Sequence, residues 1–218
     1  MATQRLLPNQ RILRYTYGER VMHWIAGLTY VYLLLTGLAF WSPHLYWLAQ
    51  LLGGGSFSRA VHPWVGVVFT AVMLWMYKEW ASDMQPTPAD RSWKASLGHY
   101  VRNEDEKVPA AGRFNYGQKQ FFWVMFWSTI ALQVSGIGLW FVGAIPWTLV
   151  WLRYLAILVH VVAALLTIGA FIIHVYMGLA VVREGFTSVV RGEVSEEWAR
   201  THHPLWLAQV RGEPTPKK

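Results

Sequence analysis

Four of the eight histidines in this 218-residue chain lie inside long apolar segments: His23, His62, His160 and His174. A neutral imidazole in an apolar or membrane environment costs free energy unless it binds a partner, so each of the four is a candidate functional residue. Histidine side chains commonly bind zinc and haem iron. For any one of them taken alone, a hydrogen-bonded packing role is the alternative.

The spacing of two of these histidines places them on one helix face. His160 and His174 are fourteen residues apart in the segment LVHVVAALLTIGAFIIHVYMGL, which carries no formal charge. On an α-helix, fourteen residues fall about 40° short of four full turns and advance about 21 Å along the axis. The two imidazoles therefore share a face but cannot meet at one ion, which excludes a single zinc site built from all four histidines.

The apolar segments predict the fold. Hydrophobic residues make up 54% of the chain and charged residues 14%, a balance typical of an integral membrane protein. Each segment reaches the ~20 residues that a helix needs to cross a bilayer. The segments lie at about residues 21–41, 61–81, 121–141 and 149–182. We therefore expect an all-α membrane protein, a single domain over residues 1–218, with a four-helix transmembrane bundle and a cytoplasmic tail at 183–218.

The basic residues predict the orientation of these helices. Lys and Arg concentrate before the first segment, between the second and third, and after the fourth, whereas the other two connections hold only Arg59 and Arg153. By the positive-inside rule, both termini and the long middle loop face the cytoplasm. The net charge of +7 is then explained by topology, and no nucleic-acid partner is expected.

Once oriented, the helices bring the histidines to two depths. His23 lies at the inner end of the first segment and His62 at the outer end of the second, while the fourth segment carries His160 near the outside and His174 near the cytoplasm. His62 can thus face His160, and His23 can face His174. Two imidazoles that flank one iron form a bis-histidine b-type haem, so we predict two b haems across the membrane. A proton relay of histidines is an alternative, although the segments contain few carboxylates.

A small residue follows each candidate ligand by four positions. The four are Gly27, Gly66, Ala164 and Gly178. Positions i and i+4 share a helix face, and a flat macrocycle pressed against a helix needs such a bare patch. Close packing between membrane helices explains small residues equally well.

The other histidines and the cysteine count narrow the chemistry. His44, His99, His202 and His203 lie in connections or in the tail, where we expect solvated side chains. The chain has no cysteine, which excludes a covalently attached c-type haem, a cysteine-ligated iron–sulfur cluster and a zinc–thiolate site.

Five stretches of the sequence carry a family resemblance. They are RVMHW at 20–24, VHPWVG at 61–66, GRFNYGQKQFFW at 112–123, HVVAALLTIGAFIIHVYMG at 160–178 and GEVSEEWARTHHPLW at 192–206. In these stretches the chain resembles the cytochrome b (gamma) subunit of membrane-bound respiratory formate dehydrogenase. The tail and FNYGQK are the most family-specific parts, whereas the histidine set is shared with related four-helix cytochromes b of other oxidoreductases.

This resemblance implies a three-subunit complex in the bacterial cytoplasmic (inner) membrane. A molybdenum- or tungsten-containing catalytic (alpha) subunit would oxidise formate on the outer face, and an iron–sulfur (beta) subunit would pass electrons to this chain, which anchors both. Electrons would enter at the haem of His62 and His160, cross to the haem of His23 and His174, and reduce menaquinone or ubiquinone near the cytoplasmic side. The chain would then be the electron-transfer and quinone-reducing subunit, with formate oxidation in another chain. Family members associate into larger multimers.

The resemblance also implies a quinone pocket beside the inner haem, at Asn115, Gly117 and His174, with Gln118 as a neighbour. An asparagine amide can donate to or accept from a quinone oxygen, and glycine allows close approach of the backbone. From the residues alone, Asn115 as a helix N-cap and Gly117 as a turn residue form the alternative.

Two other functions compete with this one. The same kind of subunit could serve a nickel–iron hydrogenase or a thiosulfate or polysulfide reductase, because the substrate chemistry lies in another chain. A haem-free anchor or transporter would use the histidines only for packing or proton relay. A reduced-minus-oxidised spectrum distinguishes a haem-free anchor or transporter from a cytochrome b, because a haem-free protein has no b-type α band.

Overall fold

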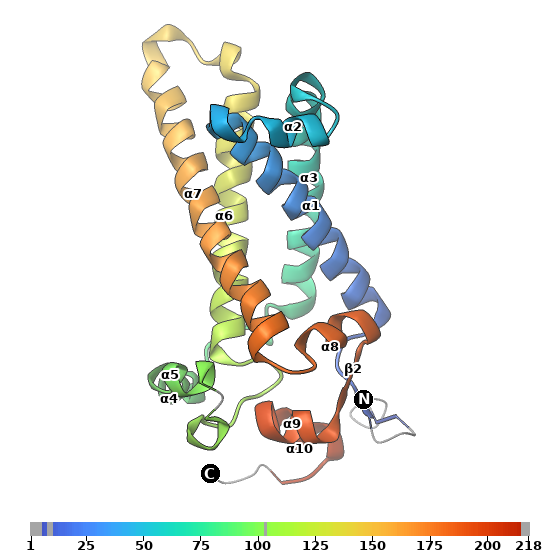
Figure 1. The fold of residues 1–218 in the computed structure, drawn as a ribbon. Coiled ribbons are helices and arrows are strands. Elements are labelled where there is room, and N and C mark those ends of the chain that lie inside the picture. The colour runs from blue at the N-terminus through green and yellow to red at the C-terminus, as the bar shows by residue number, and fades with distance from the viewer. Residues whose placement is uncertain (1–5, 8–10, 103, 215–218) are drawn as a thin grey trace. The chain divides into compact units, whose positions relative to one another are not determined.

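Four long helices confirm the predicted fold class. The computed structural model describes residues 6–7, 11–102 and 104–214. The long helices are α1 (Tyr17–Trp41), α3 (Gly55–Trp80), α6 (Tyr116–Trp140) and α7 (Val150–Tyr176) (Figure 1). With the short helix η5 (Trp147–Leu149) before it and the π-helical turn η6 (Met177–Val181) after it, α7 forms one apolar stretch of 35 residues. All four helices are long and apolar enough to cross a membrane.

Three of these helices begin earlier than the apolar runs predict, and local signals start two of them, α6 and α3. In α6, Asn115 and Gln118 form a capping box, in which each side chain accepts a hydrogen bond from the other's backbone N–H at 3.0 Å. Before α3, Gly53 and Gly54 both have positive φ values, of 94° and 92°, and turn the chain into the helix. His62 therefore lies in the interior of α3 rather than at its end.

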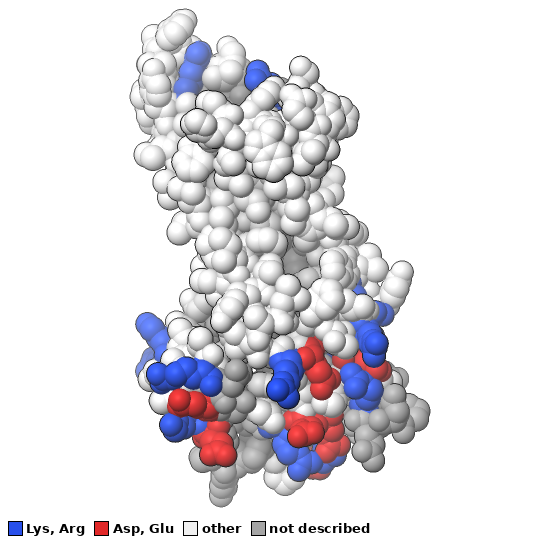
Figure 2. Space-filling model, in the orientation of Figure 1, with Lys and Arg blue, Asp and Glu red and all other residues white. Residues whose placement is uncertain are grey.

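The chain divides into two compact units. The bundle unit comprises Met22–Lys78 and Val124–Phe171, and the terminal unit comprises Met1–Val21, Glu79–Trp123 and Ile172–Lys218. In sequence, the charged residues of the bundle unit are Arg59, Lys78 and Arg153, and all acidic residues of the chain fall in the terminal unit. Figure 2 shows charges of both signs gathered on the terminal unit, whereas the surface of the bundle unit is almost entirely uncharged.

Aromatic side chains join the helices of the bundle unit. Tyr30 of α1 packs against Phe69 of α3 and Phe171 of α7, with ring centroids 5.8 and 4.8 Å apart. Tyr77 of α3 stacks on Phe126 of α6 at 4.7 Å. The outer faces are apolar and exposed, and only 11% of the most apolar window in Trp147–Val181 is buried. Such a surface suits lipid rather than water.

Short elements complete the two units. The bundle unit also holds η2 (Pro43–Leu45), α2 (Trp47–Leu51) and η4 (Val142–Ala144). The terminal unit holds β1 (Arg11–Leu13), α4 (Pro88–Ala95), α5 (Leu97–Val101), η3 (Asp105–Lys107), α8 (Gly185–Arg191), β2 (Glu193–Ser195), α9 (Glu196–His202) and α10 (Pro204–Arg211).

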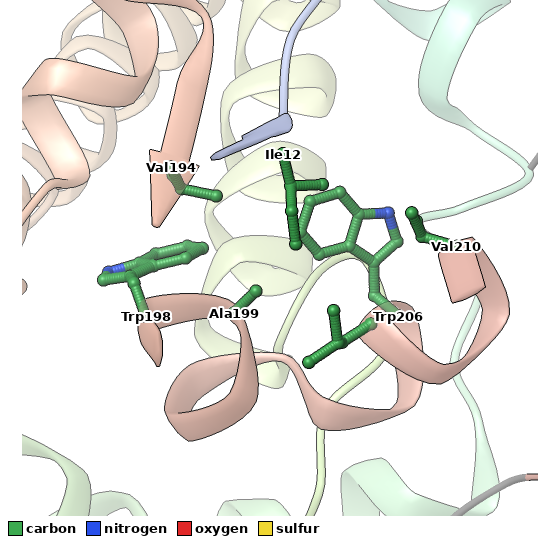
Figure 3. Packing of buried hydrophobic residues seen from close by; sticks show 7 residues of the cluster. Ile12, Val194, Trp198, Ala199, Trp206 and Val210 are labelled. Atoms are coloured by element: carbon green, nitrogen blue, oxygen red, sulfur yellow. The ribbon is translucent and has the colours of Figure 1, made fainter. Parts of the chain in front are cut away.

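The tail is folded onto the N-terminal strand. β1 and β2 pair antiparallel, with Ile12 opposite Val194. Both side chains are buried in a cluster with Trp198 and Trp206, which point toward each other from α9 and α10 (Figure 3). This cluster is a hydrophobic core within the terminal unit, and it gives both tryptophans of the tail a packing role.

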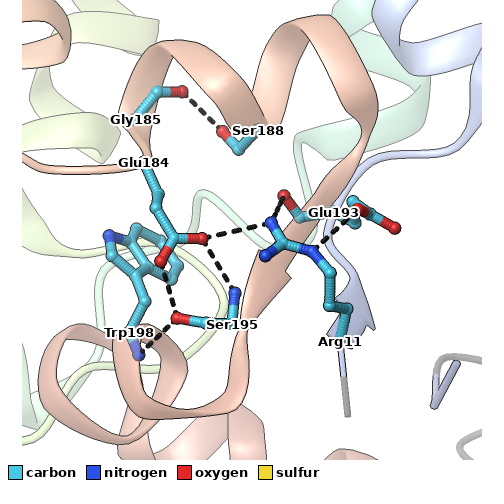
Figure 4. A network of polar contacts seen from close by, with 7 residues as sticks. All are labelled: Arg11, Glu184, Gly185, Ser188, Glu193, Ser195 and Trp198. Atoms are coloured by element: carbon cyan, nitrogen blue, oxygen red, sulfur yellow. Dashed lines mark hydrogen bonds and ion pairs between the residues drawn. The ribbon is translucent and has the colours of Figure 1, made fainter. Parts of the chain in front are cut away.

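A polar network joins the start of α8 to β2 and β1. Glu184 has the left-handed φ of 61°, which is strained for a residue with a side chain. Its carboxylate accepts hydrogen bonds from the backbone N–H and the hydroxyl of Ser195, at 2.9 and 2.6 Å, and pairs with Arg11 at 3.3 Å (Figure 4). Gly192 also has positive φ, and an added Cβ would come within 2.7 Å of the Tyr15 carbonyl oxygen, so only glycine fits there.

The prediction of a solvated His203 is wrong. This residue is 1% exposed, and its Nδ1 donates to the carbonyl of Gly112 at 2.7 Å. Its Nε2 lies 3.4 Å from the guanidinium of Arg14, which is fully buried over the ring of Trp206. Burial and the adjacent Arg14 hold the pKa of His203 well below its usual value of 6.5.

We expect the terminal unit to lose stability in mild acid. The unfolded chain binds a proton at His203 below about pH 6.5 and the folded chain does not, so stability is full above that pH and falls below it, by up to about 1.4 kcal/mol per pH unit. Hydrogen–deuterium exchange of peptides from the tail measures this effect. The variant His203→Asn retains an N–H donor for Gly112 but does not titrate, and an equal pH dependence in both proteins would contradict this assignment.

Candidate functional site

His62 is held by a hydroxyl from the neighbouring helix. Its Nδ1 lies 2.7 Å from Oγ1 of Thr36, which is fully buried in α1. The residue after Thr36 is Gly37, where an added Cβ would lie 4.0 Å from Cε1 of His62. Phe40, one turn further, meets the imidazole edge-on with ring centroids 5.5 Å apart. These contacts fix the plane and direction of the ring.

His160 has the same arrangement on the other pair of helices. Its Nδ1 lies 3.0 Å from Oγ of Ser135, which is buried in α6. The next residue is Gly136, where an added Cβ would crowd Cε1 of His160 at 3.3 Å. A Ser-Gly pair on α6 therefore does for His160 what the Thr-Gly pair on α1 does for His62.

These two histidines lie in the same unit, and the other two belong to different units. His62 and His160 both lie in the bundle unit. His23 lies in the bundle unit with its ring edge-on to Trp24, and His174 belongs to the terminal unit, where it stacks on Phe121 with centroids 4.2 Å apart and planes within 6°. The pairing of His23 with His174 stays a prediction.

The residues predicted for a quinone are engaged in structural roles. Asn115 is 3% exposed, and besides capping α6 it donates from Nδ2 to the Tyr100 hydroxyl at 3.2 Å. Gln118 completes the cap. An added Cβ at Gly117 would meet only ordinary contacts, at 3.5 Å or more, so packing by itself does not demand glycine there. The capping alternative is thus confirmed for Asn115, and binding of a quinone by these residues and His174 stays a prediction.

Sequence reasoning did not identify a buried ion pair beside Asn115. Lys119 and Asp90 lie 2.9 Å apart with side chains only 7% and 11% exposed, and both line a cavity of about 300 Å³ with Asn115 and Trp93. Burial by itself would raise the pKa of Asp90, but the hydrogen bonds from Lys119 and Thr87 outweigh it and lower the pKa. The carboxylate is therefore ionised at neutral pH. The only signal in the sequence was a lysine at the start of an apolar helix.

Residues 14–187 of the chain match the family model described as prokaryotic cytochrome b561. This match spans most of the chain and all of α1, α3, α6 and α7. The chain belongs to the prokaryotic cytochrome b561 family. Members of this family are helical bundles that carry b-type haem, and the four apolar helices make this member an integral membrane protein.

Curated relatives add a more specific likeness. The chain is 34% identical over 201 residues to the "Formate dehydrogenase, cytochrome b556(fdo) subunit" of Escherichia coli K12, with 92% of this chain and 93% of the relative covered. It is 29% identical over 205 residues to the nitrate-inducible formate dehydrogenase cytochrome b556(Fdn) subunit of the same strain, with 93% of each covered. A Haemophilus influenzae formate dehydrogenase cytochrome b556 subunit is 28% identical over 199 residues, with 91% and 83% covered.

The residues of the bundle unit fit the b haem that the cytochrome b561 family implies. His62 and His160 contact the neighbouring hydroxyls through Nδ1, which leaves Nε2 of each ring as a donor for iron. Gly66, four residues after His62, leaves its helix face bare: apart from its chain neighbours and the backbone of its own helix, no heavy atom of the described residues lies within 4 Å of an added Cβ. Neutral imidazoles in an apolar bundle without acidic residues are the donor set of a bis-histidine haem.

Substitution of Asn115 by alanine should destabilise the start of α6 by about 1 kcal/mol, because the N-cap acceptor is lost. For a chain of this size, that loss lowers the midpoint of thermal unfolding by roughly 2–4 °C. Asn115→Asp keeps the acceptor and should lose less. Equal losses in the two variants, measured by thermal unfolding in detergent, would show that the cap is not what Asn115 contributes.

Proposed function

We propose that this chain is the membrane-anchoring, di-haem cytochrome b subunit of a formate dehydrogenase. It would transfer electrons from an iron–sulfur (beta) subunit across the bacterial inner membrane to a quinone on the cytoplasmic side. The observation that carries this proposal is the 34% identity with a formate dehydrogenase cytochrome b556 subunit over 92% of the chain. Formate oxidation would take place in a molybdenum or tungsten (alpha) subunit, and the assembly can repeat as a multimer.

Four histidines would hold the two haems. His62 and His160 would ligate the outer haem, and His23 and His174 the inner haem. When bound, the haems supply centres that accept and release one electron at a time. The chain's own residues orient the imidazoles and surround them with apolar side chains. These exclude water and lower the dielectric around the site.

Charge supports the proposed orientation. Both termini and the loop between α3 and α6 belong to the terminal unit, which holds most of the Lys and Arg residues. The connections between α1 and α3 and between α6 and α7 hold no Lys or Arg, and Arg59 and Arg153 lie near the starts of α3 and α7. By the positive-inside rule, the terminal unit faces the cytoplasm and the catalytic partners dock on the opposite side. Each electron that moves inward then works against about 2.3 kcal/mol per 100 mV of membrane potential.

Asn115, Gly117, Gln118 and His174 would form the quinone site. Reduction of a quinone to a quinol consumes two electrons and two protons, and a site in the cytoplasmic unit can draw those protons from that side. Asn115 lines the described cavity together with Asp90 and Lys119, so polar groups that can interact with a quinone oxygen gather at one place. The Asn115 amide nitrogen carries two hydrogens and donates one to Tyr100, so the second would be donated to the quinone oxygen.

The first test removes one proposed ligand. In the purified complex, His160→Ala should lose one of two b haems and at least 100-fold of formate-driven quinone reduction, because the remaining imidazole cannot hold the iron alone. Haem content and the reduced-minus-oxidised spectrum measure the loss. His44→Ala is the matched control, since His44 is exposed in the short connection after α1. Retention of both haems in His160→Ala would refute the assigned pairing, and reduction by hydrogen in place of formate would assign the chain to a hydrogenase.

The second test separates the two roles of Asn115. Asn115→Asp keeps the helix cap but has no amide donor, so we expect quinone turnover to fall at least tenfold while formate still reduces both haems. Single-turnover haem reduction and steady-state quinone reduction measure the two steps. A fall in haem reduction equal to the fall in turnover would make Asn115 a structural residue only.

A further inference from the structure

We propose that Thr36 and Ser135 are positioning residues that select the tautomer of the two imidazoles and raise the electron-donating power of their Nε2 atoms. This inference rests on the proposed ligation by His62 and His160. It adds two helices, α1 and α6, to a site whose ligands come from α3 and α7.

The hydroxyl of Thr36 already donates its hydrogen within its own helix. It donates to the helix carbonyl of Tyr32 at 2.8 Å, as threonine does when its side chain bonds back to the preceding turn. A hydroxyl carries one hydrogen and two lone pairs, so toward Nδ1 of His62 it accepts. The Nδ1–H of His62 then donates to the Thr36 hydroxyl, and that hydroxyl donates to the Tyr32 carbonyl. Each hydrogen is used once, and the lone pair of the imidazole is left on Nε2.

Ser135 repeats this logic at His160. Its hydroxyl donates to the carbonyl of Ala131 at 2.7 Å and lies 3.0 Å from Nδ1 of His160. Thr36 and Ser135 are both buried, so water does not substitute for either acceptor. Two hydroxyls on different helices that both follow this pattern indicate a common role rather than chance packing.

The expected consequence is a lower reduction potential. A hydrogen bond from the distal N–H of a ligating imidazole makes the ligating nitrogen a better donor, which stabilises ferric relative to ferrous iron. The glycine after each hydroxyl lets the imidazole approach its helix, and at Gly136 a Cβ would crowd the ring at 3.3 Å. The backbone and the hydroxyl thus fix both the position and the rotation of each imidazole.

Thr36→Val and Ser135→Ala remove the acceptors with little change in shape. In the purified haem-loaded complex, we expect each variant to raise the midpoint potential of one haem, with a ferrous-to-ferric ratio shifted by about tenfold, which is 59 mV for one electron. The electron paramagnetic resonance signal of the same ferric haem should shift as its imidazole rotates. Thr36→Ser restores the hydroxyl and should behave as wild type.

Two control variants test whether the effect is specific to Thr36 and Ser135. Thr29→Val and Ser128→Ala alter hydroxyl residues on the same two helices for which no contact with an imidazole is recorded, and both should retain wild-type potentials. Unchanged potentials and resonance signals in Thr36→Val and Ser135→Ala, with both haems present, would overturn this inference and leave the proposed function intact. Absence of any b-type α band in the wild type would overturn both. If Thr36→Val does not accumulate, Ser135→Ala, the smaller change, decides alone.

Discussion

An imidazole in an apolar membrane helix needs a hydrogen-bond partner, and in the bundle unit two buried hydroxyls supply it. Thr36 and Ser135 supply the partners of His62 and His160, and each hydroxyl is itself satisfied by a carbonyl of its own helix. The need for a hydroxyl at a defined height on a neighbouring helix couples α1 to α3 and α6 to α7. Hydrogen bonds between these polar side chains, and not apolar contacts alone, therefore fix how far each helix of a pair is shifted along its neighbour.

The terminal unit solves a different problem, which is how to hold a polar tail without a large core. Its cluster around Ile12, Trp198 and Trp206 is small, and it is supplemented by the buried Arg14 and the neutral His203. Arg14 is surrounded by aromatic rings and also donates to the carbonyl of Arg113. The tail residues that carry the family resemblance thus have a structural role, since they form β2 and contribute Trp198 and Trp206 to the buried cluster.

The cavity next to Asn115 is lined by polar groups that are already hydrogen-bonded or ion-paired. Every polar group of the Asn115 side chain already has a partner, and the nearby Lys119–Asp90 pair neutralises its own charge. The second N–H of the Asn115 amide can still donate to a ligand, which favours a ligand with its own acceptors over an apolar one. A quinone oxygen has this property.

The sequence by itself determined the four apolar helices, because length and hydropathy are local properties, and it singled out four histidines, because charge-poor helices leave few polar residues to consider. It also contained the capping box that starts α6. Only the tertiary structure revealed Thr36 and Ser135 as partners of His62 and His160, and buried His203 against Arg14. A hydroxyl in a membrane helix can satisfy itself on its own backbone, so its second bond depends on which helix lies beside it. The burial of His203 depends in the same way on a partner 189 residues away in sequence.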